Sequence, residues 1–188
     1  MTLDKTTTAP SNAHIPAGRY RLAPELTTVS FTAKKFGVFT VSGTMAVTSG
    51  SFTVGDEIGR SSLHAVLAAD TFRTPMSNRD KHVKGASLLD VASYPTVEFN
   101  STEVVRTPAG WEVQGLLRVH GTVAPVALIV TAAAQEGALV RLSAHARIDR
   151  RHFGVTRMRF AASSVVEIRI QATGIPVDKA QAPGAPGA

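Results

Sequence analysis

The sequence contains no cysteine, few aromatic residues and no long hydrophobic run. The absence of cysteine excludes disulfide bonds, thiolate zinc sites and thiol catalysis. Aromatic residues make up only 6% of the chain, which argues against a nucleic-acid binder that stacks bases on exposed rings. The apolar stretches are shorter than the roughly 20 residues that a transmembrane helix needs, so we expect no membrane-spanning helix.

Length and composition indicate one folded domain between two tails. The chain has 188 residues, 44% of them hydrophobic, and a net charge of +6 that permits an anionic partner without requiring one. We expect a flexible N-terminal tail at 1–16, a folded domain at 17–176 and a flexible tail rich in Ala, Pro and Gly at 177–188. The N-terminal segment lacks the apolar run of a secretion signal, so we expect a cytoplasmic protein.

Alternation of apolar and polar residues predicts strands. It is complete over 140–148, where Val140, Leu142 and Ala144 share one face and Arg141 and Ser143 the other. Segments 111–120 and 165–172 alternate similarly, and weaker strands are expected at 20–22, 28–34, 40–54, 60–70, 96–105 and 123–134. Turn sequences at 107–110 and 135–137 predict hairpins. This pattern predicts an all-β antiparallel meander that closes into a barrel or stacks as a sandwich.

One segment differs from the strands. Residues 75–91 have helical composition and predict one short helix followed by a loop, with Ser77 and Asn78 as N-cap candidates. Within it, the run Arg79-Asp80-Lys81-His82 is compatible with a polar head-group site or with acid–base chemistry. The alternative, which we favour, is that Arg79 and Asp80 pair and fix the helix to the end of the barrel.

A second charged run, RIDRRHFGVTRMR, holds Arg147, Arg150, Arg151, Arg157 and Arg159. These side chains are suited either to a phosphate or anionic lipid head or to a solvated loop. Asp80 and His82 have no further ligand at a metal-binding spacing, so we expect no metal site. The sequence has no nucleophile elbow and no phosphate-binding glycine loop. We therefore expect no catalytic residues and no cofactor.

The inward-facing positions of the predicted strands include bulky and small residues. Phe31, Trp111, Val113, Leu117, Leu142, Ala144 and Ile168 are expected to face inward. Small residues such as Gly115, Ala144 and Ala146 leave space on that apolar face, whereas the aromatic rings are able to fill it. The pattern alone leaves a packed core and an apolar cavity open as alternatives.

Four segments in the right order resemble the YceI-like family. They are GRYRLAPELTTVSFTAKKFGVFTVSGTM, DTFRTPMSNRDKHVKGASLLDVASYPTVEFNS, GLLRVHGTVAPVAL and IDRRHFGV. The second is the most specific, since its R-D-x-H, D-V and Y-P-x-x-x-F elements fall on Arg79, Asp80, His82 and the residues that follow. The chain departs from the family at Leu88 and Leu89, where aromatic residues are common, and at 28–30, where His-Ser is usual.

The resemblance implies an eight-stranded, elongated, lipocalin-like barrel with one short helical segment. It also implies an apolar tunnel for a polyisoprenoid, such as a polyprenyl quinone or polyprenyl phosphate, and binding without catalysis. We predict that the tunnel is lined by Phe31, Phe36, Phe39, Met45, Leu67, Phe99, Trp111, Val113, Leu117, Leu142, Ala144 and Ile168. The head-group candidates are Arg79, Asp80, His82, Arg150 and Arg151.

Two other functions stay open from the sequence. One is an enzyme that acts on a lipid-like substrate through Asp80 and His82. The other is a module that binds an anionic surface through the arginines between Arg147 and Arg159. A nucleic-acid partner is not expected, and a homodimer is compatible with the sequence.

Overall fold

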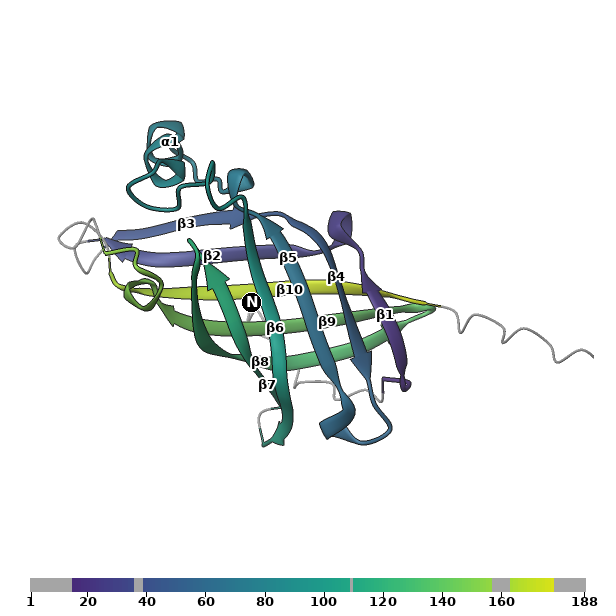
Figure 1. Cartoon of the computed structure of the whole chain (residues 1–188). Coiled ribbons are helices and arrows are strands. Elements are labelled where there is room, and N and C mark those ends of the chain that lie inside the picture. Colours follow the sequence, from purple (N-terminus) through teal and green to yellow (C-terminus); the bar gives the residue numbers. More distant parts are fainter. Residues whose placement is uncertain (1–14, 36–38, 109, 157–162, 178–188) are drawn as a thin grey trace, which may run out of the picture.

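The computed structural model describes residues 15–35, 39–108, 110–156 and 163–177. This part of the chain contains ten antiparallel strands and one α-helix (Figure 1). The strands are β1 (Gly18–Leu22), β2 (Thr28–Lys35), β3 (Phe39–Met45), β4 (Val47–Val54), β5 (Ser62–Ala68), β6 (Thr96–Thr107), β7 (Gly110–Val119), β8 (Thr122–Glu136), β9 (Leu139–Asp149) and β10 (Val165–Pro176). The helix, α1, spans Ser77–Lys84, and no helix in the described ranges is long and apolar enough to cross a membrane.

The strands form a closed barrel because the first strand pairs with the last. β1 pairs with β4 on one side and with the C-terminal half of β10 on the other, while β2 pairs with the N-terminal half of β10. β1 and β2 are thus one long strand bent at Pro24–Leu26, and β3 and β4 are a second one bent at Ala46. Counted in this way, the ten strands make an eight-stranded antiparallel barrel, which confirms the expected fold class.

The predicted hairpins are present, whereas the single strand predicted at 40–54 forms two strands, β3 and β4. Thr107 pairs with Gly110 and Glu136 pairs with Leu139, at the two turns that the sequence indicated. The segment forms two strands because its first half, β3, pairs with β2, whereas its second half, β4, pairs with β1 and β5. A register shift between Val47 and Ser49 increases the bend at this point.

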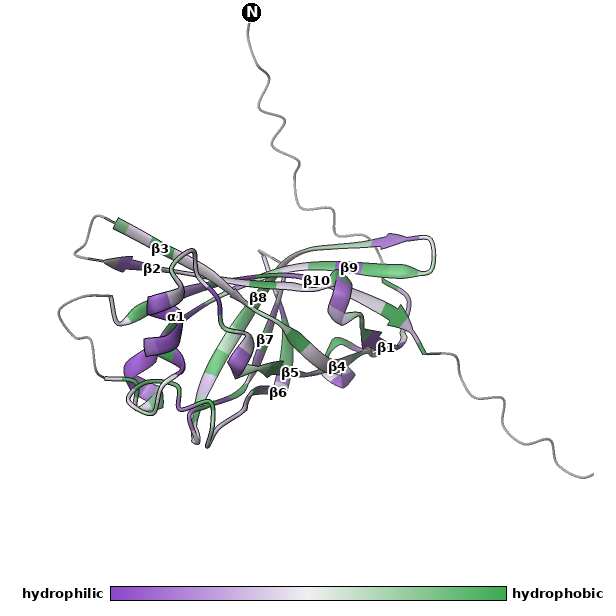
Figure 2. Ribbon diagram, turned by 90° about the horizontal axis from the view of Figure 1, so that it is seen from above, coloured by the Kyte–Doolittle hydropathy of each residue, from purple (hydrophilic) through white to green (hydrophobic). Residues whose placement is uncertain are grey.

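The segment between β5 and β6 lies where the barrel wall is incomplete. β5 ends at Ala68, so the outer edge of β3 has, among the described residues, a single bridge from Thr44 to Arg73. The segment that follows carries α1 and lies at the end of the barrel where β2 ends and β3 begins (Figure 1). Figure 2 shows that α1 is mainly hydrophilic, whereas the strands carry a mixture of hydrophilic and hydrophobic residues. We call residues 69–95 the cap segment.

The expected N-caps of the helix were wrong. Met76 occupies the N-cap position and makes no capping hydrogen bond through its side chain, and Ser77 is already the first helical residue. The turn that precedes the helix is instead held by Thr74, whose Oγ1 accepts a hydrogen bond from the Met76 N–H at 3.2 Å. Thr74 is buried, so it is suited to this structural role.

Two clusters of buried apolar residues form the core of the barrel. One contains Phe99, Val104, Val113, Leu128, Val130 and Ala146. The other contains Tyr20, Leu22, Val47, Phe52 and Val140, with the rings of Tyr20 and Phe52 stacked at 4.9 Å. The second cluster lies where β1 closes the barrel, so burial of these side chains stabilises the contact between the two ends of the domain.

Gly115 does not leave the free space that the sequence suggested. A Cβ atom at this position would lie 2.5 Å from the ring of Phe99 and 2.5 Å from the carbonyl oxygen of Asn100. The ring of Phe99 on β6 already occupies the room above the glycine on β7. The close approach of these two strands therefore depends on the missing side chain.

Gly115→Ala is expected to lower the free energy of unfolding by about 1–3 kcal/mol, because the added methyl overpacks a buried site. Chemical denaturation of both proteins measures the difference. Gly59→Ala is the control, since nothing lies within 4 Å of a Cβ atom at Gly59. Equal stability of the Gly115 and Gly59 variants would contradict the tight contact.

Candidate functional site

The barrel encloses an apolar cavity of about 400 Å³. Its wall is made by inward-facing residues of all ten strands, and its end is formed by the cap segment and by the turn after β9. The polar residues on its lining are Thr27, Arg79, Arg150 and Ser163. Within the described residues, no carboxylate side chain lines the cavity. A volume of this size is typical of sites that take a small molecule or part of a larger one.

Most predicted tunnel residues lie on this cavity. They are Phe31, Met45, Leu67, Phe99, Leu117, Leu142, Ala144 and Ile168. They come from seven strands, and alternation places each of them on the inner face. The structure brings these residues together around one space, and their contact with a ligand stays a prediction.

Three predicted tunnel residues lie elsewhere. Val113 packs in the cluster around Phe99 and Trp111 packs against it, but neither is on the lining of the cavity. Phe39 is 66% exposed, because it is the first residue of β3 and pairs with Lys35 at the end of the β2–β3 hairpin. The alternation pattern gives the face of a strand but not the point at which a strand leaves the barrel wall. Phe36 lies outside the described residues.

The cap segment supplies lining residues that sequence analysis did not identify. They are Phe72, Val83, Leu88 and Leu89. The ring of Phe72 stacks on that of Phe31 at 4.8 Å and so joins the cap segment to β2. The signal in the sequence was the apolar pair Leu88-Leu89 in a charged segment, which indicates one face turned to an apolar environment.

The predicted pairing of Arg79 with Asp80 was wrong. Oδ1 of Asp80 accepts hydrogen bonds from the Thr74 N–H at 2.9 Å and the Thr74 hydroxyl at 2.7 Å. Nη2 of Arg79 donates instead to the sulfur of Met76 at 2.8 Å. Consecutive helix residues point in different directions, so adjacency in the sequence did not bring these two groups together.

The helix separates the head-group candidates that it carries. Arg79 lines the cavity together with Val83, one helical turn later, whereas His82 is exposed and away from the lining. Asp80 fixes the turn before the helix through Thr74. Of the three candidates in the cap segment, the structure brings Arg79 alone to the cavity.

Arg150 and Arg151 are neighbours in sequence but point to different environments. Arg150 lines the cavity and donates from Nη1 to the carbonyl of Val155 at 2.7 Å and from Nε to the carbonyl of Ser163 at 3.2 Å. Burial lowers the pKa of the Arg150 guanidinium, and the negative charge of the nearby Asp149 partly offsets this decrease. Arg151 is exposed, and its Nε bonds Asp149 at 3.0 Å. Arg150 thus holds together the segment after β9, and Arg151 lies outside the cavity.

The Arg151 guanidinium and backbone N–H hold the pKa of the Asp149 carboxyl well below its usual range. The folded state therefore favours the ionised form, and this contribution to stability is present above the unfolded pKa of about 4 and is lost as the pH falls below it.

Asp149→Asn is expected to lower the melting temperature at pH 7, with the difference from the parent shrinking below pH 4. Melting curves between pH 3 and pH 7 measure this, and a difference independent of pH would contradict it.

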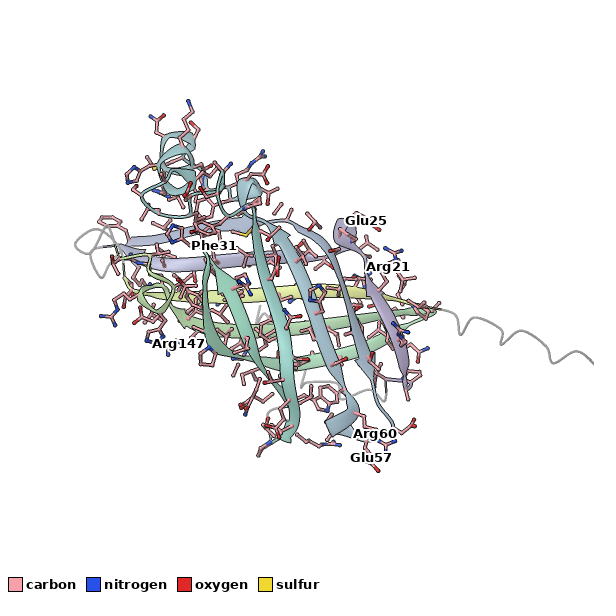
Figure 3. The ribbon with its side chains drawn as sticks, viewed as in Figure 1. Arg21, Glu25, Phe31, Glu57, Arg60 and Arg147 are labelled. Carbon is pink, nitrogen blue, oxygen red and sulfur yellow. The ribbon has the colours of Figure 1, made fainter. Side chains whose placement is uncertain are left out.

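The arginines between Arg147 and Arg159 do not form one described surface. Arg147 lies on the outside of the barrel, with 71% of its side chain exposed and Glu167 at 4.0 Å (Figure 3). Arg150 points inward, and Arg151 is bonded to Asp149. Arg157 and Arg159 lie outside the described residues. Within the described ranges, no group of three His, Asp or Glu side chains is placed to hold a metal ion.

Comparison with known proteins identifies a family over most of the chain. The family model described as the YceI-like domain matches residues 20–174. A UPF0312 protein of Yersinia pestis (strain Pestoides F) is 30% identical over 155 residues, which cover 79% of this chain and 81% of the relative. A UPF0312 protein of Yersinia enterocolitica is 27% identical over 153 residues, covering 78% and 80%.

Solved structures show the same fold. BcnA of Burkholderia cenocepacia superimposes with a TM-score of 0.71 at 18% identity, covering 81% of this chain and 98% of BcnA. A domain of Saccharophagus degradans, described as a polyisoprenoid binding domain implicated in plant cell wall breakdown, gives a TM-score of 0.64 at 11% identity. It covers 86% of this chain and all of that domain. At these identities the superpositions establish the shared barrel alone.

Proposed function

Since the chain belongs to the YceI-like domain family, we propose that it binds a long apolar lipid, most simply a polyisoprenoid, inside its barrel. The observation that carries this proposal is the apolar cavity of about 400 Å³ whose wall consists of aliphatic and aromatic side chains. The fold neighbour described as a polyisoprenoid binding domain supports the same ligand class. The role would be carriage, storage or sequestration of the lipid.

Several features of the cavity suit a prenyl chain. Branched and aromatic side chains line its length, and small side chains at Ala65, Ala144 and Ala146 leave it open. Transfer of an apolar chain from water into this space is favourable by about 25 cal/mol per Å² of buried apolar surface. The polar residues Arg79, Arg150 and Ser163 come from the cap segment and from the segment after β9. A ligand with one polar end and a long apolar body would satisfy both kinds of lining.

The alternative of a lipid-directed enzyme has less support. Asp80 is bonded to Thr74, and His82 is exposed and does not line the cavity. An acid–base pair needs both groups within hydrogen-bonding reach of the substrate. The cytoplasmic location expected from the sequence stays a prediction, and the homodimer and the anionic-surface function stay open alternatives.

Extraction of the purified protein with organic solvent, followed by mass spectrometry, tests the proposal. The expected result is a co-purifying prenyl lipid, and the delipidated protein is expected to bind the C20 alcohol geranylgeraniol. Absence of a retained lipid together with no binding of geranylgeraniol by delipidated, folded protein would contradict the proposed function.

A further inference from the structure

We propose that Arg79 selects ligands whose polar end is an anion, with a phosphate monoester as the best fit. This inference rests on the proposed function, since it assigns the polar end of the ligand that the barrel would hold. It concerns a single side chain of α1 that reaches the lining of the apolar cavity.

The guanidinium of Arg79 has more hydrogen-bonding capacity than its partners in the described part of the chain use. It carries five N–H donors. Within the described residues, its recorded acceptor is the thioether sulfur of Met76, which is a weak acceptor. The nearest acidic residue in sequence, Asp80, directs its Oδ1 atom to Thr74 instead. Among the residues that the structure describes, Arg79 is thus a cation on the cavity lining without a carboxylate to balance it.

The second cation on the lining is in a different situation. Arg150 is partly buried and donates to the carbonyls of Val155 and Ser163, so it has a structural function in the protein itself. Replacing Arg150 would disturb the segment after β9 whether or not a ligand binds. Arg79 lacks such carbonyl partners among the described contacts, so it is the better candidate for contact with a ligand.

The surroundings of Arg79 favour an anion over a neutral head. The other cap-segment residues on the lining are Phe72, Val83, Leu88 and Leu89, whose side chains provide no competing acceptor. In a partly desolvated apolar site, a charge-assisted hydrogen bond is stronger than a neutral one, and a guanidinium fits phosphate through two parallel bonds. A quinone carbonyl or an alcohol is a neutral acceptor, so it would accept a hydrogen bond from Arg79 without balancing the positive charge of the guanidinium.

The remaining charged residues of α1 do not compete for this role. Lys81 and His82 are exposed, and neither they nor Lys84 at the end of the helix line the cavity. Lys81 lies two residues from Arg79 on the same helix and carries the same charge. It therefore provides a control that changes the net charge of the helix equally without changing the lining.

Titration of delipidated protein with geranylgeranyl phosphate and with geranylgeraniol tests this inference. The two ligands share one C20 chain and differ in the head. The parent is expected to bind the phosphate about ten-fold to a hundred-fold more tightly than the alcohol. Inorganic phosphate at millimolar concentration is expected not to displace geranylgeranyl phosphate, because without the prenyl chain it gains no apolar burial.

Arg79→Gln is expected to reduce the preference for phosphate to about one-fold to two-fold, because the loss of affinity is larger for the phosphate than for the alcohol. Lys81→Gln is expected to keep the parental preference. Arg79→Lys retains the charge but not the two-bond geometry, so it is expected to give an intermediate preference. Melting curves establish that each variant is folded, and Arg79→Lys decides the test should Arg79→Gln not fold.

The possible failures are distinguishable. Equal binding of both ligands by the parent would overturn the role of Arg79 and leave the proposed function intact. An equal loss in Arg79→Gln and Lys81→Gln would show a general effect of net charge and would also overturn it. Binding of neither ligand by the folded parent would contradict the proposed function as well.

Discussion

Ala144→Trp is expected to weaken binding of a prenyl lipid by at least about a hundred-fold, equivalent to roughly 2.7 kcal/mol, while the barrel still folds. Ala144 lies in the middle of β9, between Val130 and Ile170 on the neighbouring strands, and its methyl group lines the cavity. An indole at this position projects into the cavity, where it takes the space of the lipid chain. Titration with geranylgeraniol measures the loss.

His145→Trp is the control for this variant. His145 is the next residue of β9, is exposed, and faces away from the lining of the cavity. The same indole added there is expected to leave lipid binding unchanged. Parental affinity in Ala144→Trp would show that the lipid does not occupy this part of the cavity. A loss in both variants would indicate damage to β9 instead of a blocked cavity.

Leu142→Asp is expected to lower the free energy of unfolding by about 3–5 kcal/mol, because it places an unpaired carboxylate in an apolar interior. Leu142 lines the cavity and packs against both apolar clusters of the barrel. The residues that pair with Leu142 on the neighbouring strands are Ala133 and Ala172, and neither carries a charge that would balance the new carboxylate. Urea denaturation monitored by circular dichroism measures the change.

His145→Asp provides the control for the charge itself, since it places a carboxylate on the outer face of the same strand. It is expected to change stability by less than about 0.5 kcal/mol, as is usual for exposed sites. A comparably small effect for Leu142→Asp would mean that position 142 is accessible to water, and this would contradict an apolar cavity. Ala144→Trp and Leu142→Asp therefore test the same cavity in two ways, the first by filling it and the second by placing a charge in it.

The faces of the strands were determined by the sequence itself. Alternation over β9 and β10 placed Leu142, Ala144 and Ile168 on the inner face, and the structure has them there. Local pattern is sufficient for this because successive side chains of a strand point to opposite sides. The turns at 107–110 and 135–137 were likewise predictable, since both depend on a few neighbouring residues.

The alternation pattern did not show which inward-facing residues line the cavity and which pack in the core. Val113 and Leu117 lie on the same face of β7, yet Val113 packs in a cluster and Leu117 lines the cavity. The difference arises from side chains on other strands, such as Phe99, whose ring fills the space above Gly115. Packing of this kind joins residues that are distant in sequence, so alternation along one strand carries no information about it.

The tertiary structure also decided the partners of the charged residues. The sequence places Arg79 beside Asp80 and Arg150 beside Arg151, but helix and turn geometry directs each pair apart. Closure of the barrel between β1 and β10 brings Tyr20 next to Pro176, the two ends of the domain. The sequence by itself determined which residues form the strands and which of their faces is apolar. Only the tertiary structure decided where that face encloses a cavity and which cations lie on its lining, because these depend on contacts between residues far apart in the chain.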